Sequence, residues 1–230
     1  MTIVDLTLAH ADETDILAIN VMEKKGFKTG VTRNYWAPKK EPDVLFVDSW
    51  LSMFAHCGTH LDSPRHIFRW GKTVDQIELD RFMGPGCVLD FSKKKADEPI
   101  TAKELERHGK LVKKGDIVLI RTDWSDKTWG SAAYMFQSPF LTGDGAKWCV
   151  DKGLKAVGFD FLQEEEVKKS PNNVPEKYVV HRTLLENGII QIEHMTNLKS
   201  ISKRRCQVIA LPLKLVGVEG SPCRAVAIVD

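Results

Sequence analysis

One short segment, His56-Cys57-Gly58-Thr59-His60-Leu61-Asp62-Ser63-Pro64-Arg65-His66, holds three imidazoles and one carboxylate within eleven positions. Imidazole nitrogen and carboxylate oxygen are ligands that Zn²⁺ and Mn²⁺ accept. The chain has only seven histidines, so three in one segment favour a metal site over three unrelated surface residues in a turn. Three protein ligands would leave coordination positions open, which is typical of a catalytic site.

The elements around this segment decide which of its side chains can meet. A glycine and a proline inside it disfavour a regular helix, so the spacing is not that of a helical metalloprotease motif. The apolar and aromatic run 44–55 predicts a strand that ends at the segment. A turn directly after that strand can bring His56, His60 and Asp62 to one point.

Strands and helices interleave along the rest of the chain, but some strands also follow one another directly. This order predicts a mixed α/β fold in a single domain over residues 1–230. Residues 23–43 read as a long loop, and Gly84-Pro85-Gly86 as a turn before a strand. The predicted strands are 4–8, 87–91, 117–122, 156–160, 189–192, 206–213 and 225–229, and the predicted helices are 101–110, 145–152 and 178–187.

Composition narrows the function classes. The formal net charge is +2 in 230 residues, which argues against nucleic acid or an anionic membrane as the main partner. Five cysteines form no C-x-x-C pair, and the N-terminal segment has no basic region of the kind that opens a signal peptide. No apolar run approaches the length of a membrane span. We expect a cytoplasmic protein that acts on a small molecule.

The segment from His56 to His66 also resembles a family signature. It matches H-x-G-T-H-x-D-x-P-x-H, the pattern of the cyclase-like metal-dependent hydrolases, at all seven fixed positions. That family includes bacterial kynurenine formamidase and isatin hydrolase. Further matches are Asp5-Leu6-Thr7, the H-x-x-L-L pattern from His181, and the glutamate at Glu193 before an N-L pair. The segment Asp160-Phe161-Leu162-Gln163 departs from the family pattern because it lacks a serine.

The resemblance implies roles for particular residues. His56, His60 and Asp62 resemble the ligands of one metal, and Asp62 would bridge to a second metal held by His181 and Glu193. Some members use two zinc ions, and others use a single manganese. His66 would be the acid/base residue. The resemblance also implies a swivelling β/β/α fold and a homodimer or homotetramer.

The spacing of the downstream pair is compatible with the assignment that the resemblance implies. His181 lies near the start of a predicted helix, and Glu193 lies at the end of the strand that follows. A helix–turn–strand unit is antiparallel, so we expect these two ends to return to the same side of the domain. The alternative for Glu193 is an ordinary ion pair with a neighbouring Lys or Arg.

Several other residues have both a functional and an ordinary interpretation. Loop aromatics could line a pocket for a flat ring or form a hinge or oligomer contact; these are Phe27, Tyr35 and Trp36. We expect a core tryptophan at Trp124, a small filler at Cys57 and a solvated turn at Glu164–Glu166. His194 is expected to point to the opposite face of its strand from Glu193. His10 and His108 read as surface residues.

These observations support one leading hypothesis and two alternatives. The first is hydrolysis of a C–N amide bond by a metal-activated water, with an aryl formamide or a cyclic amide as substrate. The second is hydrolysis of a lactone or other cyclic ester at the same site. The third is a metal-binding paralogue without turnover, against which the intact His66 argues.

Overall fold

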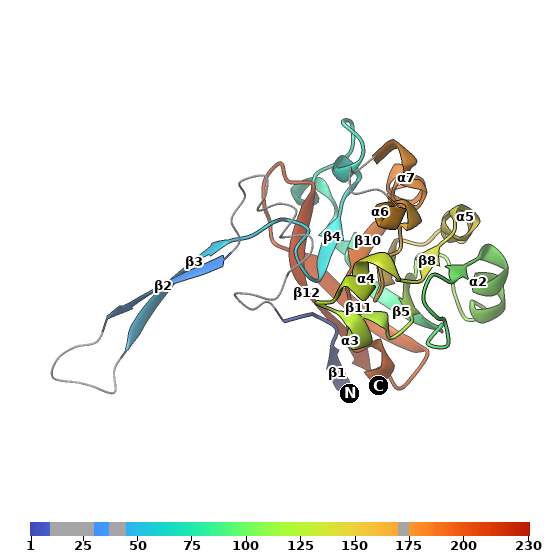
Figure 1. Cartoon of the computed structure of the whole chain (residues 1–230), viewed down its shortest axis with the longest axis horizontal. Coiled ribbons are helices and arrows are strands. Elements are labelled where there is room, and N and C mark those ends of the chain that lie inside the picture. The colour runs from blue at the N-terminus through green and yellow to red at the C-terminus, as the bar shows by residue number, and fades with distance from the viewer. Residues whose placement is uncertain (10–29, 37–44, 170–174) are drawn as a thin grey trace.

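A mixed sheet forms the centre of the computed structural model, which describes residues 1–9, 30–36, 45–169 and 175–230. Its strands are β1 (Thr2–Asp5), β4 (His60–Asp62), β5 (Met83–Asp90), β7 (Ile117–Arg121), β9 (Ala156–Phe159), β10 (Ile190–Glu193), β11 (Arg205–Pro212) and β12 (Gly220–Val229). They pair in the order β1-β12-β11-β5-β7-β9-β10-β4, and β4 pairs with β12 as well. This last pairing closes the sheet into a ring (Figure 1).

The sheet combines a parallel half with an antiparallel half. β5, β7, β9 and β10 pair in parallel, which requires crossover connections between them. Helices in these connections cover the outer face of the parallel half (Figure 1). The helices are α2 (Ala102–His108), α3 (Trp124–Thr128), α4 (Ala132–Phe136), α5 (Gly143–Asp151), α6 (Glu165–Lys169) and α7 (Val179–Glu186), and β6 (Pro99–Ile100) pairs with β8 (Phe140–Leu141) beside them.

The parallel strands are buried on both faces, as β7 illustrates. Ile117 and Leu119 belong to the apolar cluster shared with the antiparallel strands, whereas Val118 and Ile120 belong to the cluster under the helices. All four are fully buried, and side chains of this size contribute about 1.5–3 kcal/mol each on burial. This double burial explains why the sequence shows continuous apolar runs rather than alternation here.

The mixed α/β prediction is confirmed, and most predicted elements are present. Thr101 caps α2 with the expected capping box, in which its side chain accepts from the Glu104 amide. The Gly84-Pro85-Gly86 prediction is wrong, because this stretch lies inside β5 and pairs with β11. At Gly86 an added Cβ would lie 2.5 Å from Val208, so the glycine permits a close approach of the strands and does not mark a turn.

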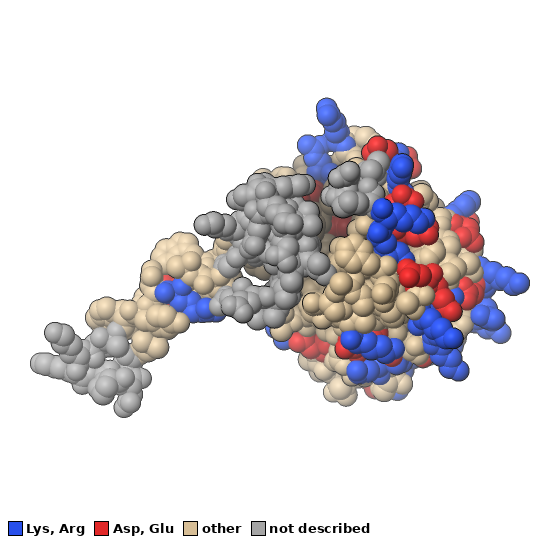
Figure 2. All heavy atoms as spheres, in the orientation of Figure 1, with Lys and Arg blue, Asp and Glu red and all other residues tan. Residues whose placement is uncertain are grey.

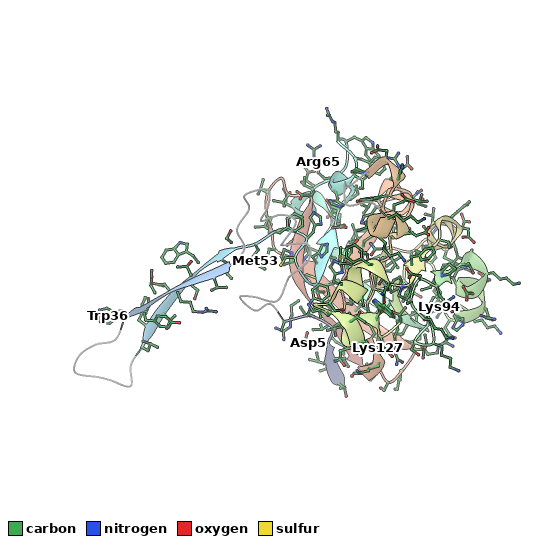
Figure 3. All side chains as sticks on the ribbon, viewed as in Figure 1. Asp5, Trp36, Met53, Arg65, Lys94 and Lys127 are labelled. Carbon is green, nitrogen blue, oxygen red and sulfur yellow. The ribbon has the colours of Figure 1, made fainter. Side chains whose placement is uncertain are left out.

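The predicted loop 23–43 is also wrong in part. Residues 30–36 form β2 (Gly30–Trp36), which pairs over its whole length with β3 (Phe46–Ser52) inside the predicted strand 44–55. This hairpin, called the arm below, projects away from the rest of the molecule (Figure 1). Residues 23–29 and 37–43 fall outside the described residues. Met53 marks where the chain returns from the arm, while Trp36 lies near its far end (Figure 3).

The lengths of the helices and the state of the cysteines complete the description of the fold. None of the described helices is both long and apolar enough to cross a membrane. None of the five cysteines, all of which are described, forms a disulfide, and four of them are buried.

Candidate metal centre

The register of β4 explains why two signature residues face the same way. Side chains alternate along a strand, so His60 and Asp62 share one face while Leu61 enters the apolar core, where it is fully buried. β4 pairs with β10 so that Glu193 lies opposite His60. A bond of 2.8 Å between His60 Nδ1 and the Gly58 carbonyl then leaves Nε2 facing the two carboxylates.

The helix–strand unit α7–β10 brings the downstream pair to the same place. His181 Nε2 lies 3.0 Å from Glu193 Oε1 and 3.7 Å from Asp62 Oδ2. His60 Nε2 lies 3.7 Å from Glu193 Oε2 and 3.4 Å from Asp62 Oδ1. The structure therefore brings both halves of the predicted site together. Glu193 contacts histidines and a glutamine here, so the ordinary Lys or Arg pair is excluded for the described residues.

His56 reaches the cluster from the turn before β4. Its Nδ1 lies 2.7 Å from Asp62 Oδ1, and its Nε2 lies 3.2 Å from Glu219 Oε1. Gly220 makes room for the ring, because an added Cβ there would lie 2.7 Å from His56 Cε1. The C-terminal strand β12, which follows Glu219, therefore shapes this half of the site.

His66 lies against the cluster rather than apart from it. It ends a short 3-10 turn, Pro64–His66, and its ring centroid is 4.1 Å from that of His56 and 5.8 Å from that of His181. One potential ligand atom from each of His56, Asp62 and His66 falls within a single group 4.8 Å across. The same holds for His60, Asp62 and Glu193. His66 is thus close enough to be a ligand or an acid/base group.

Two buried atoms in the cluster lack a hydrogen-bond partner, and they fit a cation. His60 Nε2 and Asp62 Oδ2 are both buried and unpartnered. Leaving such groups unsatisfied costs about 1–3 kcal/mol each. An imidazole nitrogen and a carboxylate oxygen facing one space are a donor set that divalent cations accept. The residues present therefore fit a divalent metal.

The pKa values of the clustered residues also indicate that the site favours a positive charge. Burial opposes a positive imidazole, yet Asp62 and Glu219 raise the pKa of His56 to about 10. Burial likewise opposes protonation of His181, but Glu164 and Glu193 raise its pKa to about 10. The histidine cations in turn hold the pKa of the Asp62 carboxyl well below its usual value, although burial would raise it. The carboxylates therefore draw positive charge into a buried site.

His66 and His194 behave oppositely. Burial, aided by the positive charges of His56 and His181, lowers the pKa of His66 to about 4 despite the attraction of Asp62. Burial also lowers the pKa of His194 to about 4, aided by His60. Both rings are therefore neutral at neutral pH.

The prediction that His194 faces away from Glu193 is wrong. β10 ends at Glu193, and His194 has a φ of 52°, so the chain leaves the strand and the alternation stops. Its Nε2 lies 3.8 Å from Glu193 Oε2, and its ring is 5.2 Å from that of His60. Tyr134 and His194 Nδ1 share a hydrogen bond of 2.6 Å, which fixes the ring.

Two residues that form hydrogen bonds in or behind the site, Glu164 and Gln163, were missed by sequence reasoning. Glu164 is 2% exposed and contacts His181, so the predicted solvated turn is wrong at this residue, whereas Glu165 pairs with Lys169 at the surface. Gln163 donates to Gln191 and to Glu193. Gln163 belongs to the segment that departs from the family pattern, and that departure was the available signal.

The remaining candidates have ordinary structural roles. Trp124 packs against the cluster under the helices, and Cys57 is 3% exposed, as expected for a core tryptophan and a small filler. Tyr35 and Trp36 are each 64% exposed on the arm, so they lie on the surface of the described part of the chain rather than in a pocket of it. Phe27 and His10 fall outside the described residues.

His108 lies far along the chain from this cluster and belongs to a different surface feature. Its ring stacks on Phe91 with centroids 4.5 Å apart, so it is half-buried rather than a free surface residue. Both line a cavity of about 730 Å³ whose other lining groups include Arg107 and Lys203. None of the clustered histidines lines this cavity, so the chemistry of the donor set, and not cavity size, identifies the candidate site.

Comparison with known proteins identifies the family of the chain. The family described as "Putative cyclase" matches residues 4–166. Kynurenine formamidase of Salinibacter ruber is 31% identical over 196 residues, covering 83% of this chain and 84% of the relative. Isatin hydrolase of Roseibium aggregatum is 28% identical over 204 residues, covering 80% of this chain and 76% of the relative.

A solved structure titled as that of a potential metal-dependent hydrolase with cyclase activity superimposes with a TM-score of 0.72 at 25% identity, over 98% of this chain and 96% of that chain. The chain therefore belongs to the cyclase family, and it is an enzyme of the hydrolase class.

Proposed function

We propose that the protein is a metal-dependent amidohydrolase that cleaves a C–N amide bond, in an aryl formamide resembling N-formylkynurenine or in a cyclic amide. The observation that carries this proposal is the buried cluster in which His60 Nε2 and Asp62 Oδ2 have no hydrogen-bond partner and potential ligand atoms of His60, Asp62 and Glu193 lie within 4.8 Å of one another. The names of the relatives, a formamidase and an isatin hydrolase, support the choice of an amide.

We assign the cation ligands as follows. His56, His60 and Asp62 would hold one divalent ion, Zn²⁺ or Mn²⁺. Where a second ion binds, His181 and Glu193 would hold it together with Asp62. A divalent ion bound here would acidify water and polarise the substrate carbonyl. The short separations among these five side chains support the assignment.

His66 is assigned as the acid/base residue. Hydrolysis adds water to the carbonyl carbon and breaks its bond to nitrogen, so one proton must leave the water and one must reach the amine. The His66 ring, between those of His56 and His181, is placed to carry that proton. General acid–base catalysis of this kind is worth about 10²–10⁴-fold.

Aromatic side chains beside the cluster support an aryl substrate. The Trp129 ring lies 5.3 Å from that of His194 and 4.8 Å from that of Tyr134. His194 in turn adjoins His60. A flat ring stacked on this wall would carry its carbonyl toward the cluster, since offset and edge-to-face aromatic contacts are favourable.

A turnover screen tests the proposal against its alternatives. The protein is stripped of metal, reloaded with Zn²⁺ or Mn²⁺, and supplied with N-formylkynurenine, an aryl formamide, isatin and an aryl lactone. We expect metal-dependent release of an arylamine from the formamides, or opening of the isatin ring to a product with a free arylamine and a carboxylate. Preference for the lactone would favour the ester alternative. Metal binding with no turnover on any substrate would favour the paralogue.

We further propose that the protein is a homodimer or homotetramer in which the arm packs against a second copy. Every residue of β3 is exposed, and Trp50 and Leu51 are 62% and 69% exposed. An isolated two-stranded hairpin is marginally stable in water, so a partner surface would stabilise it. Figure 2 shows the described part of the arm as mostly uncharged, in contrast to the charged far end of the molecule.

Light scattering after gel filtration tests this assembly. Leu51→Lys should shift the protein toward monomer, because a charge would enter the contact. Leu79→Lys is the matched control, since Leu79 is 67% exposed but lies outside the arm. A monomeric wild-type protein would refute the proposal. We also propose a cytoplasmic location, which five cysteines without a disulfide support.

A further inference from the structure

Glu164 is a buried carboxylate that neither the signature nor the assigned ligand set uses. It directly precedes α6 and is 2% exposed, whereas the side chains of its neighbours Glu165 and Glu166 are 40% and 29% exposed. A buried charged group is costly unless hydrogen bonds satisfy it. Its partners therefore indicate what this residue is for.

Among the described residues, the hydrogen-bond partners of Glu164 all belong to the first turn of α7. Glu164 Oε2 accepts from the Val180 amide at 3.0 Å and from the His181 amide at 3.2 Å. The first amides of a helix have no partner within it, and the residue at the N-cap, Tyr178, provides no side-chain cap. Glu164 thus supplies the missing cap from a segment 16 residues upstream.

The third contact reaches the histidine ring itself. Glu164 Oε2 lies 3.1 Å from His181 Nδ1. A carboxylate beside Nδ1 keeps a hydrogen on that nitrogen, which leaves the lone pair of the neutral ring on Nε2. That nitrogen faces Glu193 and Asp62, at 3.0 Å and 3.7 Å. One carboxylate therefore fixes both the position of the helix end and the tautomer of its histidine.

We propose that Glu164 is a positioning residue, which holds His181 with Nε2 directed at the cation site and so raises the affinity of the site for a divalent ion. The inference rests on the proposed function only in that a cation binds between His181, Glu193 and Asp62. Groups that orient metal-ligating histidines in this way are worth about 10–100-fold in metal affinity.

The test measures Zn²⁺ affinity by competition with a chelator in Glu164→Gln. Glutamine keeps the size and an oxygen acceptor for the helix amides but removes the charge facing Nδ1. We expect affinity for the zinc bound at His181 to fall about 10–100-fold, and turnover to recover at raised Zn²⁺. Glu165→Gln removes the same charge one residue along, at the surface, and should leave affinity unchanged.

Three outcomes separate the interpretations. Wild-type zinc affinity in Glu164→Gln, with a lowered Tm, would show a helix cap only and overturn the inference. A wild-type protein that binds zinc but hydrolyses nothing would refute the proposed function while leaving this comparison intact. A wild-type protein that binds no zinc would overturn both.

A second measurement does not depend on the variant folding. In ¹H–¹⁵N spectra of the zinc-loaded wild-type protein, His181 should carry its hydrogen on Nδ1. A His181 ring with its hydrogen on Nε2 would overturn the inference, because Nε2 would then be unable to bind the ion.

Discussion

Replacing Glu193 by glutamine removes one of the two carboxylates at the centre of the cluster while preserving its shape. Glu193 is 5% exposed, lies 3.0 Å from His181 Nε2 and accepts a hydrogen bond from Gln163. The glutamine oxygen can still accept that bond. The substitution therefore tests the negative charge itself rather than packing.

The expected loss follows from the separation and the burial. At an effective dielectric constant of about 20, unit charges 3.0 Å apart attract by about 5 kcal/mol. Breaking a buried charge pair costs about 3–5 kcal/mol in practice. Taking the lower figure, and 1.4 kcal/mol per tenfold change, Glu193→Gln should weaken cation binding by at least about 100-fold.

Elemental analysis and chelator competition measure this directly. We expect one metal equivalent to be lost where two are bound, and most turnover with it. Glu186→Gln is the control, because Glu186 is an exposed glutamate on α7. Full metal content together with full turnover in Glu193→Gln would refute the two-part site, and only the group of His56, His60 and Asp62 would stand.

Three further predictions concern the remaining site residues. His60→Ala should remove the metal, since its Nε2 faces both carboxylates, and equal metal by elemental analysis would contradict this. His66→Ala should keep the metal and lower kcat by about 10²–10⁴-fold; a metal-free variant would instead identify His66 as a ligand. Cation affinity should rise with pH between 6 and 8, by about tenfold per pH unit for each proton displaced. Burial opposes protonation of His56 and His181, but neighbouring carboxylates raise the pKa values of both to about 10. Both rings therefore carry a proton at neutral pH that a cation must displace, and this displacement becomes easier as the pH rises. Zinc titrations giving one affinity at pH 6, 7 and 8 would contradict the last prediction.

Local sequence determined much of the candidate site. His60 and Asp62 are two residues apart in a strand, so alternation alone places them on one face. His181 and Glu193 occupy the two ends of a helix–turn–strand unit, and such a unit returns to the side from which it began. The apolar runs 117–120 and 156–159 form strands whose two faces are both buried, as their continuous apolar character indicates.

Where prediction from the sequence was wrong, backbone pairing with another strand determined the structure. Gly84-Pro85-Gly86 is a turn signal locally, yet pairing with β11, more than 100 residues later, makes it part of a strand. Residues 30–36 lie in a segment rich in Lys, Gly and Pro, which favours a loop, but they form a strand because they pair with β3. Backbone pairing supplies hydrogen bonds that local propensity does not anticipate.

The surroundings of the metal ligands were decided by tertiary structure alone. Glu164 reads as the first of three solvated glutamates until α7 packs over it and supplies donors to its carboxylate. Glu219 joins the site because β12 pairs with β4, and His194 joins because the backbone turns to a positive φ after β10. A residue type shows which atoms can bind a cation or a proton. Only the folded chain decides whether such a group is buried and which partners then satisfy it, because burial makes those partners obligatory.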